Sequence, residues 1–110
     1  MGMDAVAHAL AEPTRREILR LVRDDERTVG DIASHFPVTR PAISQHLRVL
    51  ENAELVTVRA EGNRRFYRAR PDGILELRGW METFWRDSLT ALKVEVEREL
   101  TNQQKEPTEP

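Results

Sequence analysis

The sequence predicts a mainly α fold, a winged helix-turn-helix with the element order α-α-α-α-β-β-α, dimeric and with a long C-terminal helix. Two short amphipathic segments separated by a tight turn at 37–38 predict the helix-turn-helix. Two alternating segments joined by Gly62-Asn63 predict the hairpin that forms the wing. A helical apolar stripe after Pro71 predicts the long helix. Helices and a basic hairpin in this order are typical of winged helix-turn-helix proteins.

The length and composition of the chain limit its class. Its 110 residues fit one domain, which we place at residues 4–100, followed by a disordered polar tail at 101–110. The absence of cysteine excludes a disulfide framework and thiolate metal sites, and it is typical of a cytoplasmic protein. No apolar run approaches the roughly 18 residues that a membrane span needs, so we expect no membrane partner.

Charge is distributed unevenly along the chain, although the formal net charge is only −2. Residues 1–38 carry a net charge of −2, residues 39–70 of +4 and residues 71–110 of −4. A basic segment in a mildly acidic protein favours a polyanion as the partner of one face. A solvated charged surface is the alternative interpretation.

The first two helices are predicted from apolar spacing and from helix start signals. Residues 4–10 form a short helix, and "EPTRREILRLVRD" forms the second. Pro13 suits a first helical turn, because its missing N–H is not needed there. Thr14 with Glu17 three residues later has the pattern of a capping box, which we expect to start this helix.

The helix-turn-helix begins after a polar loop, "DDER" at 24–27. Thr28 with Asp31 forms a second capping box, and we expect a helix over "VGDIASHF" at 29–36. The dipeptide at 37–38 forms the turn into the fourth helix. We expect Thr39 to cap that helix, with Arg40 and Pro41 in its first turn.

The fourth helix, "TRPAISQHLRVL" at 39–50, has one apolar and one polar face. Ile43, Leu47 and Leu50 fall at i, i+4 and i+7, which places them on the face that packs against the domain. The other face carries hydrogen-bonding side chains and no negative charge. Because the major groove of B-DNA admits one helix, we expect this face to read base edges.

The residue types of this helix suit that role. An arginine can form two hydrogen bonds to guanine and a glutamine two to adenine, while a short serine can approach a base or phosphate closely. The helix N-terminus directs N–H groups at phosphate. The predicted DNA-binding residues of the helix are Thr39, Arg40, Pro41, Ser44, Gln45, His46 and Arg48.

The hairpin is predicted to supply a second contact with DNA. "LVTVRAE" and "RRFYRAR" alternate in polarity, and arginines continue along both strands at 59, 68 and 70. Its tip carries Asn63, Arg64 and Arg65, which suit insertion at the minor groove or at a phosphate ridge. A hairpin kept soluble by charge is the alternative.

The helix predicted at 72–100 is longer than it needs to be to pack against the rest of the domain, and its apolar stripe is wide. We therefore expect a second copy to cover the stripe, with helices at 4–11 and 72–100 as the dimerisation helices. A twofold dimer would present two reading helices about 34 Å apart to a palindromic site. A pocket for an apolar effector lined by Trp80, Phe84 and Trp85 is the alternative. The predicted interface residues are Val6, Leu10, Leu77, Trp80, Met81, Phe84, Trp85, Leu89 and Leu92.

Three segments together resemble the ArsR/SmtB family of bacterial winged-helix repressors. They are "LAEPTRREILRLV", "VGDIASHFPVTRPAISQHLRVLENAELV" and "EGNRRFYRA", and the resemblance covers residues 8–70. It implies a homodimer that binds operator DNA, usually represses, and is released from DNA by an effector, here of unspecified chemistry. Arg40, Pro41, Ser44 and Gln45 match the positions at which the family contacts DNA.

One departure from the family concerns metal. Metal-sensing members carry a cysteine pair near 29–35 or Asp, His and Glu ligands on the dimer helix, and this chain has neither pattern. The pairs His8 with Glu12 and Glu95 with Glu99 could hold a metal only as part of a larger set. We therefore predict no metal and no cofactor, and a regulator of the metal-independent type.

Other functions are weighed against this interpretation. A metal-responsive repressor of the same family and a winged-helix module that binds protein are the alternatives. An enzyme is not expected, because no nucleophile–base pattern or phosphate-binding loop occurs. The side chains of Ser44 and His46, two residues apart on a helix, diverge and cannot form a dyad. The sequence thus favours a sequence-specific DNA-binding transcriptional regulator, a homodimeric repressor of a palindromic operator on double-stranded DNA.

Overall fold

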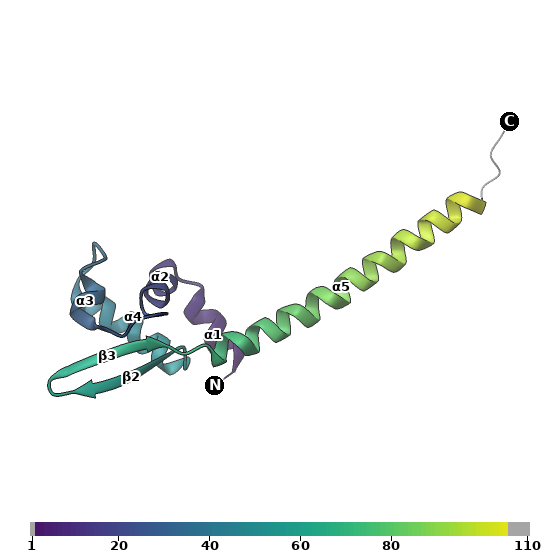
Figure 1. Cartoon of the computed structure of the whole chain (residues 1–110). Helices are drawn as coiled ribbons and strands as arrows, with labels where there is room; N and C mark the ends of the chain where they lie inside the picture. The colour runs from purple at the N-terminus through teal and green to yellow at the C-terminus, as the bar shows by residue number, and fades with distance from the viewer. Residues whose placement is uncertain (1, 106–110) are drawn as a thin grey trace. The chain divides into compact units, whose positions relative to one another are not determined.

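A computed structural model describes residues 2–105 of the chain (Figure 1). By its internal contacts the chain divides into two units, Met1–Leu77 and Arg78–Pro110. The elements in chain order are α1 (Met3–Leu10), α2 (Pro13–Leu21), β1 (Arg27–Thr28), α3 (Val29–Ala33), α4 (Arg40–Asn52), β2 (Val56–Glu61), β3 (Arg64–Ala69) and α5 (Asp72–Lys105).

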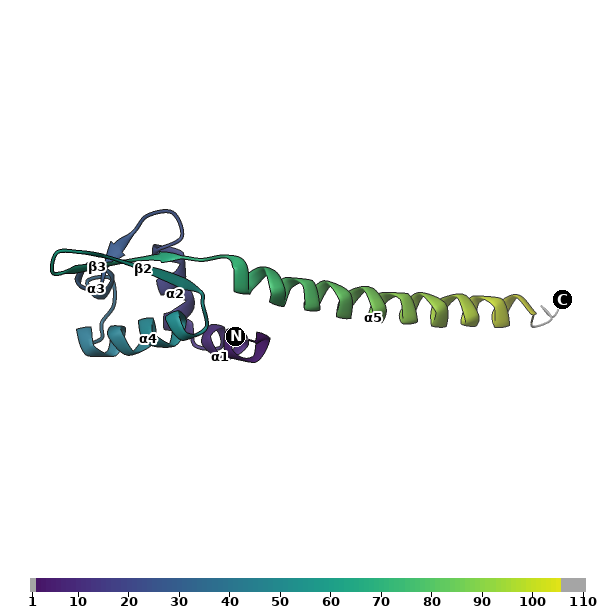
Figure 2. The same cartoon turned by 90° about the horizontal axis from the view of Figure 1, so that it is seen from below.

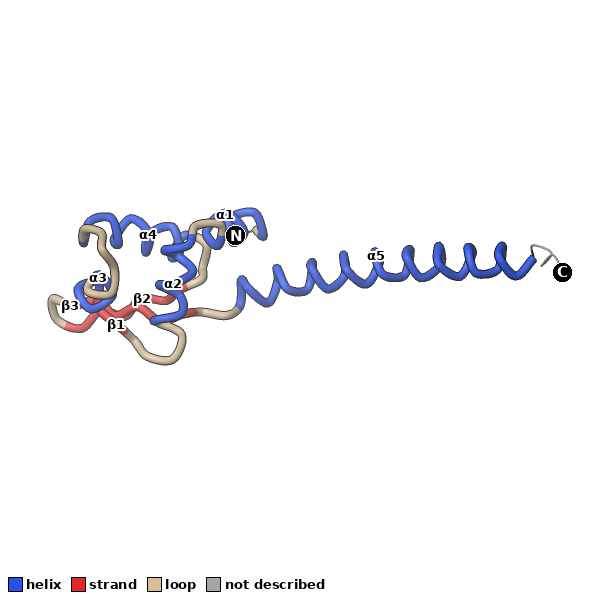
Figure 3. The backbone as a smooth tube through the Cα atoms, turned by 90° about the horizontal axis from the view of Figure 1, so that it is seen from above, coloured by secondary structure: helices blue, strands red, loops and turns tan. Residues whose placement is uncertain are grey.

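The fold is a winged helix-turn-helix, which confirms the predicted class and order, but the sheet has a third strand. β1 pairs antiparallel with β3, so that the sheet order is β1-β3-β2 (Figure 3). The expectation that 24–27 is wholly a loop is therefore wrong at its last residue, Arg27. A strand of two residues is too short to show alternation, and only its partners Tyr67 and Phe66 on β3 define it.

The predicted helix starts are confirmed for α3 and α4 and wrong for α2. Thr28 accepts a hydrogen bond from the Asp31 N–H at 3.2 Å, and Thr39 accepts one from the Ala42 N–H at 3.3 Å. At α2 the cap is Glu12, which accepts from the Arg15 N–H at 3.0 Å, and not Thr14. Because Pro13 occupies the first helical position, the capping residue is the one before it.

The core of the first unit is formed by apolar side chains from α1, α2, α3, α4 and the sheet. α4 contributes its whole predicted apolar face, since Ile43, Leu47 and Leu50 are at most 1% exposed. α3, which ends at Ala33 and not at 36, contributes Ile32. In Figures 2 and 3, α3 lies between the start of α4 and the hairpin, which contact it from two sides. The largest fully buried side chains are Ile18, Ile32, Ile43, Leu47, Leu50, Leu55, Val6 and Val22.

The end of α4 is a Schellman motif with a glutamate in the position that favours glycine. The Leu55 N–H donates to the Leu50 carbonyl and the Glu54 N–H to the Glu51 carbonyl, both at 2.9 Å. Glu54 has φ = 58°, the one positive φ of a non-glycine residue among those described. Leu50 and Leu55 are both buried, and they supply the apolar contact that accompanies this motif. The motif reverses the direction of the chain between α4 and β2.

The buried Arg15 of α2 contacts both α1 and, through His46, α4. Arg15 of α2 is 9% exposed, and its guanidinium donates to the carbonyls of Ala9 at 2.7 Å and His8 at 3.1 Å. These carbonyls belong to the last turn of α1, where backbone acceptors lack a full set of helical partners, and that of His8 also accepts from the Ala11 N–H at 3.2 Å. Arg15 therefore closes the C-terminus of α1 and holds it against α2.

The last helix continues further than predicted. α5 runs to Lys105, so residues 101–105 of the expected disordered tail are helical, and 106–110 lie outside the described residues. Gln and Lys are good helix formers, and no proline occurs between Pro71 and Pro107. No helix among residues 2–105 combines the length and the apolar character needed to cross a membrane.

α5 starts in close contact with the core of the first unit. A Cβ on Gly73 would lie 3.1 Å from Cγ2 of Val6 and 3.3 Å from Cδ2 of Leu55, both of which are buried. The absence of a side chain at Gly73 thus lets the first turn of α5 approach these residues.

Candidate nucleic-acid interface

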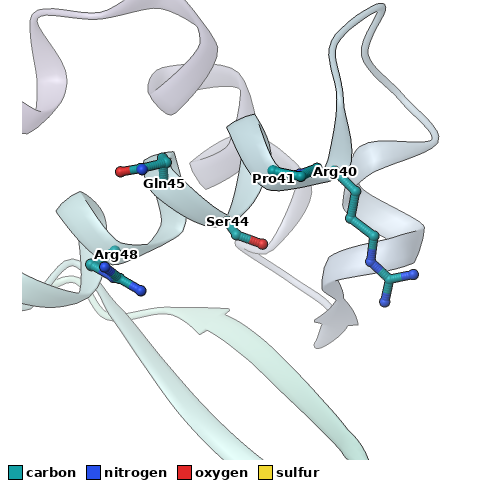
Figure 4. A pocket seen from close by; sticks show the side chains of 5 residues that line it. All are labelled: Arg40, Pro41, Ser44, Gln45 and Arg48. Atoms are coloured by element: carbon teal, nitrogen blue, oxygen red, sulfur yellow. The ribbon is translucent and has the colours of Figure 1, made fainter.

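The polar face of α4 is exposed because its opposite face is fully used by the core. Ser44, Gln45 and Arg48 are all exposed, and together with Arg40 and Pro41 they line a hollow of about 430 Å³. Figure 4 shows these side chains along one side of the helix. The residues that line this hollow include two arginines and no carboxylate. The surface therefore offers hydrogen-bond donors and positive charge to a ligand.

A second hollow lies next to the first and is lined in part by the tip of the wing. Its volume is about 500 Å³, and Arg40 lines both hollows. Arg40 of α4 and Arg64 and Arg65 of the wing thus meet at one site. The sequence predicted that the helix and the wing each contact DNA, but not that these arginines lie together. The lining residues are Thr28, Val29, Gly30, Asp31, Arg40, Asn63, Arg64 and Arg65.

The side chain of Arg40 lies against a glycine in α3. Its guanidinium carbon and Nη2 lie 3.5 Å from where a Cβ on Gly30 would stand. Arg40 therefore lies over Gly30 and shares a hollow with the wing tip. Its side chain points away from Ser44 and Gln45 (Figure 4). Nothing in the sequence indicated that Thr28–Asp31 contribute to this site, because those residues carry only the signals of a helix start.

The wing is a regular hairpin. β2 and β3 pair from Val56 with Ala69 to Glu61 with Arg64, and two residues join them. Gly62 has φ = 61°, which is the requirement of the first central residue of a type II′ turn. Asn63, Arg64 and Arg65 are exposed at this tip, as predicted.

Not every arginine of the hairpin is available to a ligand. Arg59 makes two hydrogen bonds to Glu26, at 3.0 and 3.2 Å, and one to Glu61 at 2.8 Å. This contact with Arg59 lowers the pKa of Glu26 below its usual range, and it raises that of Arg59. Arg70 is likewise paired with Asp72 at 3.1 Å. The hairpin arginines that remain for a ligand are therefore Arg64 and Arg65 at the tip and the exposed Arg68 on β3.

His46 lies on the half-buried side of α4, apart from the exposed Ser44, Gln45 and Arg48, and its contact with DNA stays a prediction. Its Nδ1 lies 3.3 Å from Nη1 of Arg15 and 3.9 Å from the Glu12 carboxylate, on the half-buried side of the helix. Residues 44 and 46 are about 200° apart around a helix, so they face different ways. Desolvation raises the pKa of Glu12, but the N–H of Arg15 and the charge of His46 outweigh it, so that pKa is lowered.

Thr39 has a structural role in the site. Its hydroxyl accepts from the Ala42 N–H, so it fixes the start of α4. This cap places Pro41 in the first turn, where it lines the hollow beside Ser44.

The residues predicted for a dimer interface separate into two groups. Val6 is 2% exposed within the core of the first unit, so its assignment to an interface between copies is wrong; it contacts the start of α5 of its own chain. Leu10 and Leu77 are partly buried against the same core. The predicted residues from the second unit are 45–59% exposed: Trp80, Met81, Phe84, Trp85, Leu89 and Leu92.

The aromatic residues of α5 stack on one another along the helix. The rings of Trp80 and Phe84 are 5.4 Å apart and nearly parallel, and Phe84 meets Trp85 edge to face at 5.7 Å. All three are about half exposed, so they form a surface of the helix. Among residues 2–105 no group of three or more His, Cys, Asp and Glu side chains is placed to hold a metal ion.

Comparison with known proteins identifies close relatives. A family model described as "Bacterial regulatory protein, arsR family" matches residues 12–58. The HTH-type transcriptional regulator Rv2034 of Mycobacterium tuberculosis is 44% identical over 87 residues, which are 79% of this chain and 81% of the relative. The transcriptional repressor SdpR of Bacillus subtilis is 37% identical over 82 residues, which are 74% of this chain and 91% of SdpR.

A solved structure agrees with the fold. The homodimeric winged helix-turn-helix DNA-binding domain of Mb0332 from Mycobacterium bovis matches with a TM-score of 0.61 and 30% identity. The match covers 76% of this chain and 78% of that domain. The helix-turn-helix and the wing described above thus occur in a known DNA-binding arrangement.

Proposed function

The chain belongs to the ArsR family of bacterial regulatory proteins, and we propose that it is a homodimeric repressor whose α4 reads a palindromic DNA operator. Its family and relatives are transcriptional regulators, a class that acts by binding and not by catalysis. The observation that carries the proposal is the exposed face of Ser44, Gln45 and Arg48 beside the arginine hollow at the wing tip.

The two hollows support a division of roles in DNA binding. Ser44 and Gln45 stand on the first turns of α4, the part of a reading helix that contacts base edges. Arg40, Arg64 and Arg65 surround the second hollow, where a phosphate group would meet three guanidinium groups. Under this proposal Gln45 specifies sequence, while Arg64 and Arg65 supply affinity that depends on salt.

Selection from a random duplex library at physiological salt tests the proposal and yields the operator. With that operator, we expect Gln45→Ala to lose about 1–3 kcal/mol of discrimination at one base pair of each half-site. Replacing both Arg64 and Arg65 with Gln should weaken binding to all sequences and reduce the salt slope by roughly one for each arginine.

The matched control for these variants is Arg78→Gln, which removes one positive charge from α5, where Arg78 pairs with Glu82. It should leave the affinity for the operator within about twofold of the wild-type value, since exposed ion pairs of this kind contribute little. Unchanged sequence preference in both Ser44→Ala and Gln45→Ala would show that α4 is not the reading helix.

The exposed apolar side chains along one side of α5 form the α5 stripe, and they support a second copy of the chain as its partner. An 11-residue period corresponds to about 3.67 residues per turn, close to that of a straight α-helix, so the stripe stays on one side along its length. Exposed apolar surface of this extent marks an interaction site. A twofold dimer would also supply the second reading helix that a palindromic operator needs. The stripe consists of Met81, Trp85 and Leu89, repeated eleven residues later as Leu92, Val96 and Leu100.

Sedimentation velocity of the full chain tests the dimer. Leu89→Glu places a carboxylate in the middle of the stripe and should convert the protein to monomers. Thr90→Glu adds the same charge about 100° around the helix and should leave the dimer intact. A Leu89→Glu protein that keeps the mass of the wild-type dimer would contradict this assignment, and circular dichroism checks that both variants remain helical.

A further inference from the structure

An apolar pocket with a rim of arginines lies within the first unit, away from the reading helix. It has a volume of about 360 Å³, within the range of small-molecule sites, and it is formed by α2, the end of β3 and the start of α5. None of its residues lines either hollow of the DNA interface. The lining residues are Arg16, Leu19, Arg20, Arg23, Ala69, Arg70, Pro71 and Ile74.

The floor of this pocket is apolar and rigidly held. Leu19 is 8% exposed and belongs to the core, while Ile74 of α5 is 39% exposed and closes one side. The Ala69 N–H donates to the Val22 carbonyl at 2.9 Å, and the Arg70 N–H donates to the Leu55 carbonyl at 2.7 Å. The end of β3 is therefore fixed against α2, so the concave shape is a property of the folded unit.

The rim carries more positive than negative charge. Arg20, Arg23 and Arg70 each meet one carboxylate, at 3.7, 3.3 and 3.1 Å, in pairs that are mostly exposed to solvent. Pairs of this kind are weak and exchange readily for another anion. Arg16 donates instead to the neutral carbonyl of Leu10 at 2.8 Å, so its charge adds to the rim.

We propose that this pocket binds a small amphipathic carboxylate, with its apolar chain on the floor at Leu19 and Ile74 and its carboxylate among the rim arginines. A DNA phosphate would be attracted by the rim but has no apolar body to cover the floor. A carboxylate with an alkyl chain matches both, because guanidinium groups hold carboxylates with paired hydrogen bonds while burial of the chain removes apolar surface from water. This proposal is independent of the identity of the operator.

Isothermal titration of the full chain with decanoate, below its micellar range and without DNA, tests the proposal. We expect saturable binding of one decanoate per chain. Octanoate, which lacks two methylene groups, should bind roughly 16-fold more weakly, since each buried methylene changes affinity by about fourfold. Decanol keeps the chain without the charge, and acetate keeps the charge without the chain, so both should bind at least tenfold more weakly than decanoate.

Variants of the pocket separate specific binding from adsorption of a detergent-like molecule. Ile74→Glu places a carboxylate at the floor and should abolish decanoate binding. Replacing both Arg20 and Arg23 with Gln should weaken decanoate at least fivefold and leave decanol unchanged. Arg86→Gln, a charge loss on α5 outside the pocket, is the control and should have no effect. Thermal unfolding of each variant confirms that it is folded.

Three outcomes would overturn the proposal. Equal binding of decanoate and decanol would show that the arginines recognise no carboxylate. Unchanged binding by Ile74→Glu would place the decanoate elsewhere. Decanoate binding that appears only when sedimentation shows the dimer to dissociate would assign the pocket to a second copy of the chain.

Discussion

α4 and α5 carry apolar stripes of the same helical kind, but among residues 2–105 only the α4 stripe is buried. In α4, Ile43, Leu47 and Leu50 are buried in the core, which leaves the opposite, polar face for a ligand. In α5, Leu89 and Leu92 are both 59% exposed. Helical periodicity alone indicates that a face of the helix will be covered. The contacts of the folded chain decide what covers it.

Alanine substitution in the two stripes gives the largest expected contrast. Leu47→Ala should lower the free energy of unfolding by about 2–5 kcal/mol, because it opens a cavity in a core that cannot close it. Leu89→Ala at low protein concentration should change that free energy by less than about 0.5 kcal/mol. Urea denaturation followed by circular dichroism measures both.

The same pair of variants sharpens the comparison when protein concentration is varied. If a second copy covers the α5 stripe, the cost of Leu89→Ala grows with concentration, because association stabilises the folded state. The cost of Leu47→Ala should not depend on concentration in the same way. Equal losses for the two variants in dilute protein would mean that the α5 stripe is already covered within one chain.

The strained end of α4 provides a second, smaller effect. Glu54→Gly should raise the free energy of unfolding by about 1 kcal/mol, because a side chain at a positive φ is strained and glycine is not. Glu51→Gly, a few residues earlier in helical backbone, is the matched control and should lower it by about 1 kcal/mol. Thermal or urea unfolding that ranks the two variants in the opposite order would contradict the Schellman geometry.

Two glycines of α5 compare its packed start with its exposed body. Gly73→Ala should destabilise the protein by about 1 kcal/mol, because the new Cβ meets the buried side chains of Val6 and Leu55. Gly79→Ala meets no atom within 4 Å and should stabilise the helix by about 0.5–1 kcal/mol. Unfolding curves recorded side by side give the sign of each change, and equal signs would remove the contrast between the two positions.

The smallest effect concerns the ion pair that fixes the wing. Because Arg59 lowers the pKa of Glu26 in the folded state, this pair contributes stability at neutral pH, which is lost as the pH falls through the lowered pKa. The unfolding midpoints of the wild type and of Glu26→Gln should therefore differ at pH 7 and converge at acidic pH. A difference that stays constant with pH would show that the hydrogen bonds, and not the charge, stabilise the wing.

Local signals predicted the elements where the chain itself makes the relevant contact. The caps at Thr28 and Thr39 each use a hydrogen bond between residues three apart, and the Gly62-Asn63 turn joins two strands that are adjacent in the sequence. The two caps and the turn are confirmed. The cap of α2 was predicted at Thr14 because the capping-box pattern is present there. Pro13 at the first helical position instead made Glu12 the capping residue.

The sequence by itself determined which residues share a face, because helical and strand periods are local properties of the backbone. It therefore predicted the polar face of α4, the basic tip of the wing and the apolar stripe of α5. Only the tertiary structure decided that His46 packs beside Arg15, that Val6 lies in the core and that Arg40 joins the wing tip over Gly30. Those contacts link residues that are far apart in the sequence, and no local pattern records which distant side chain fills a given space.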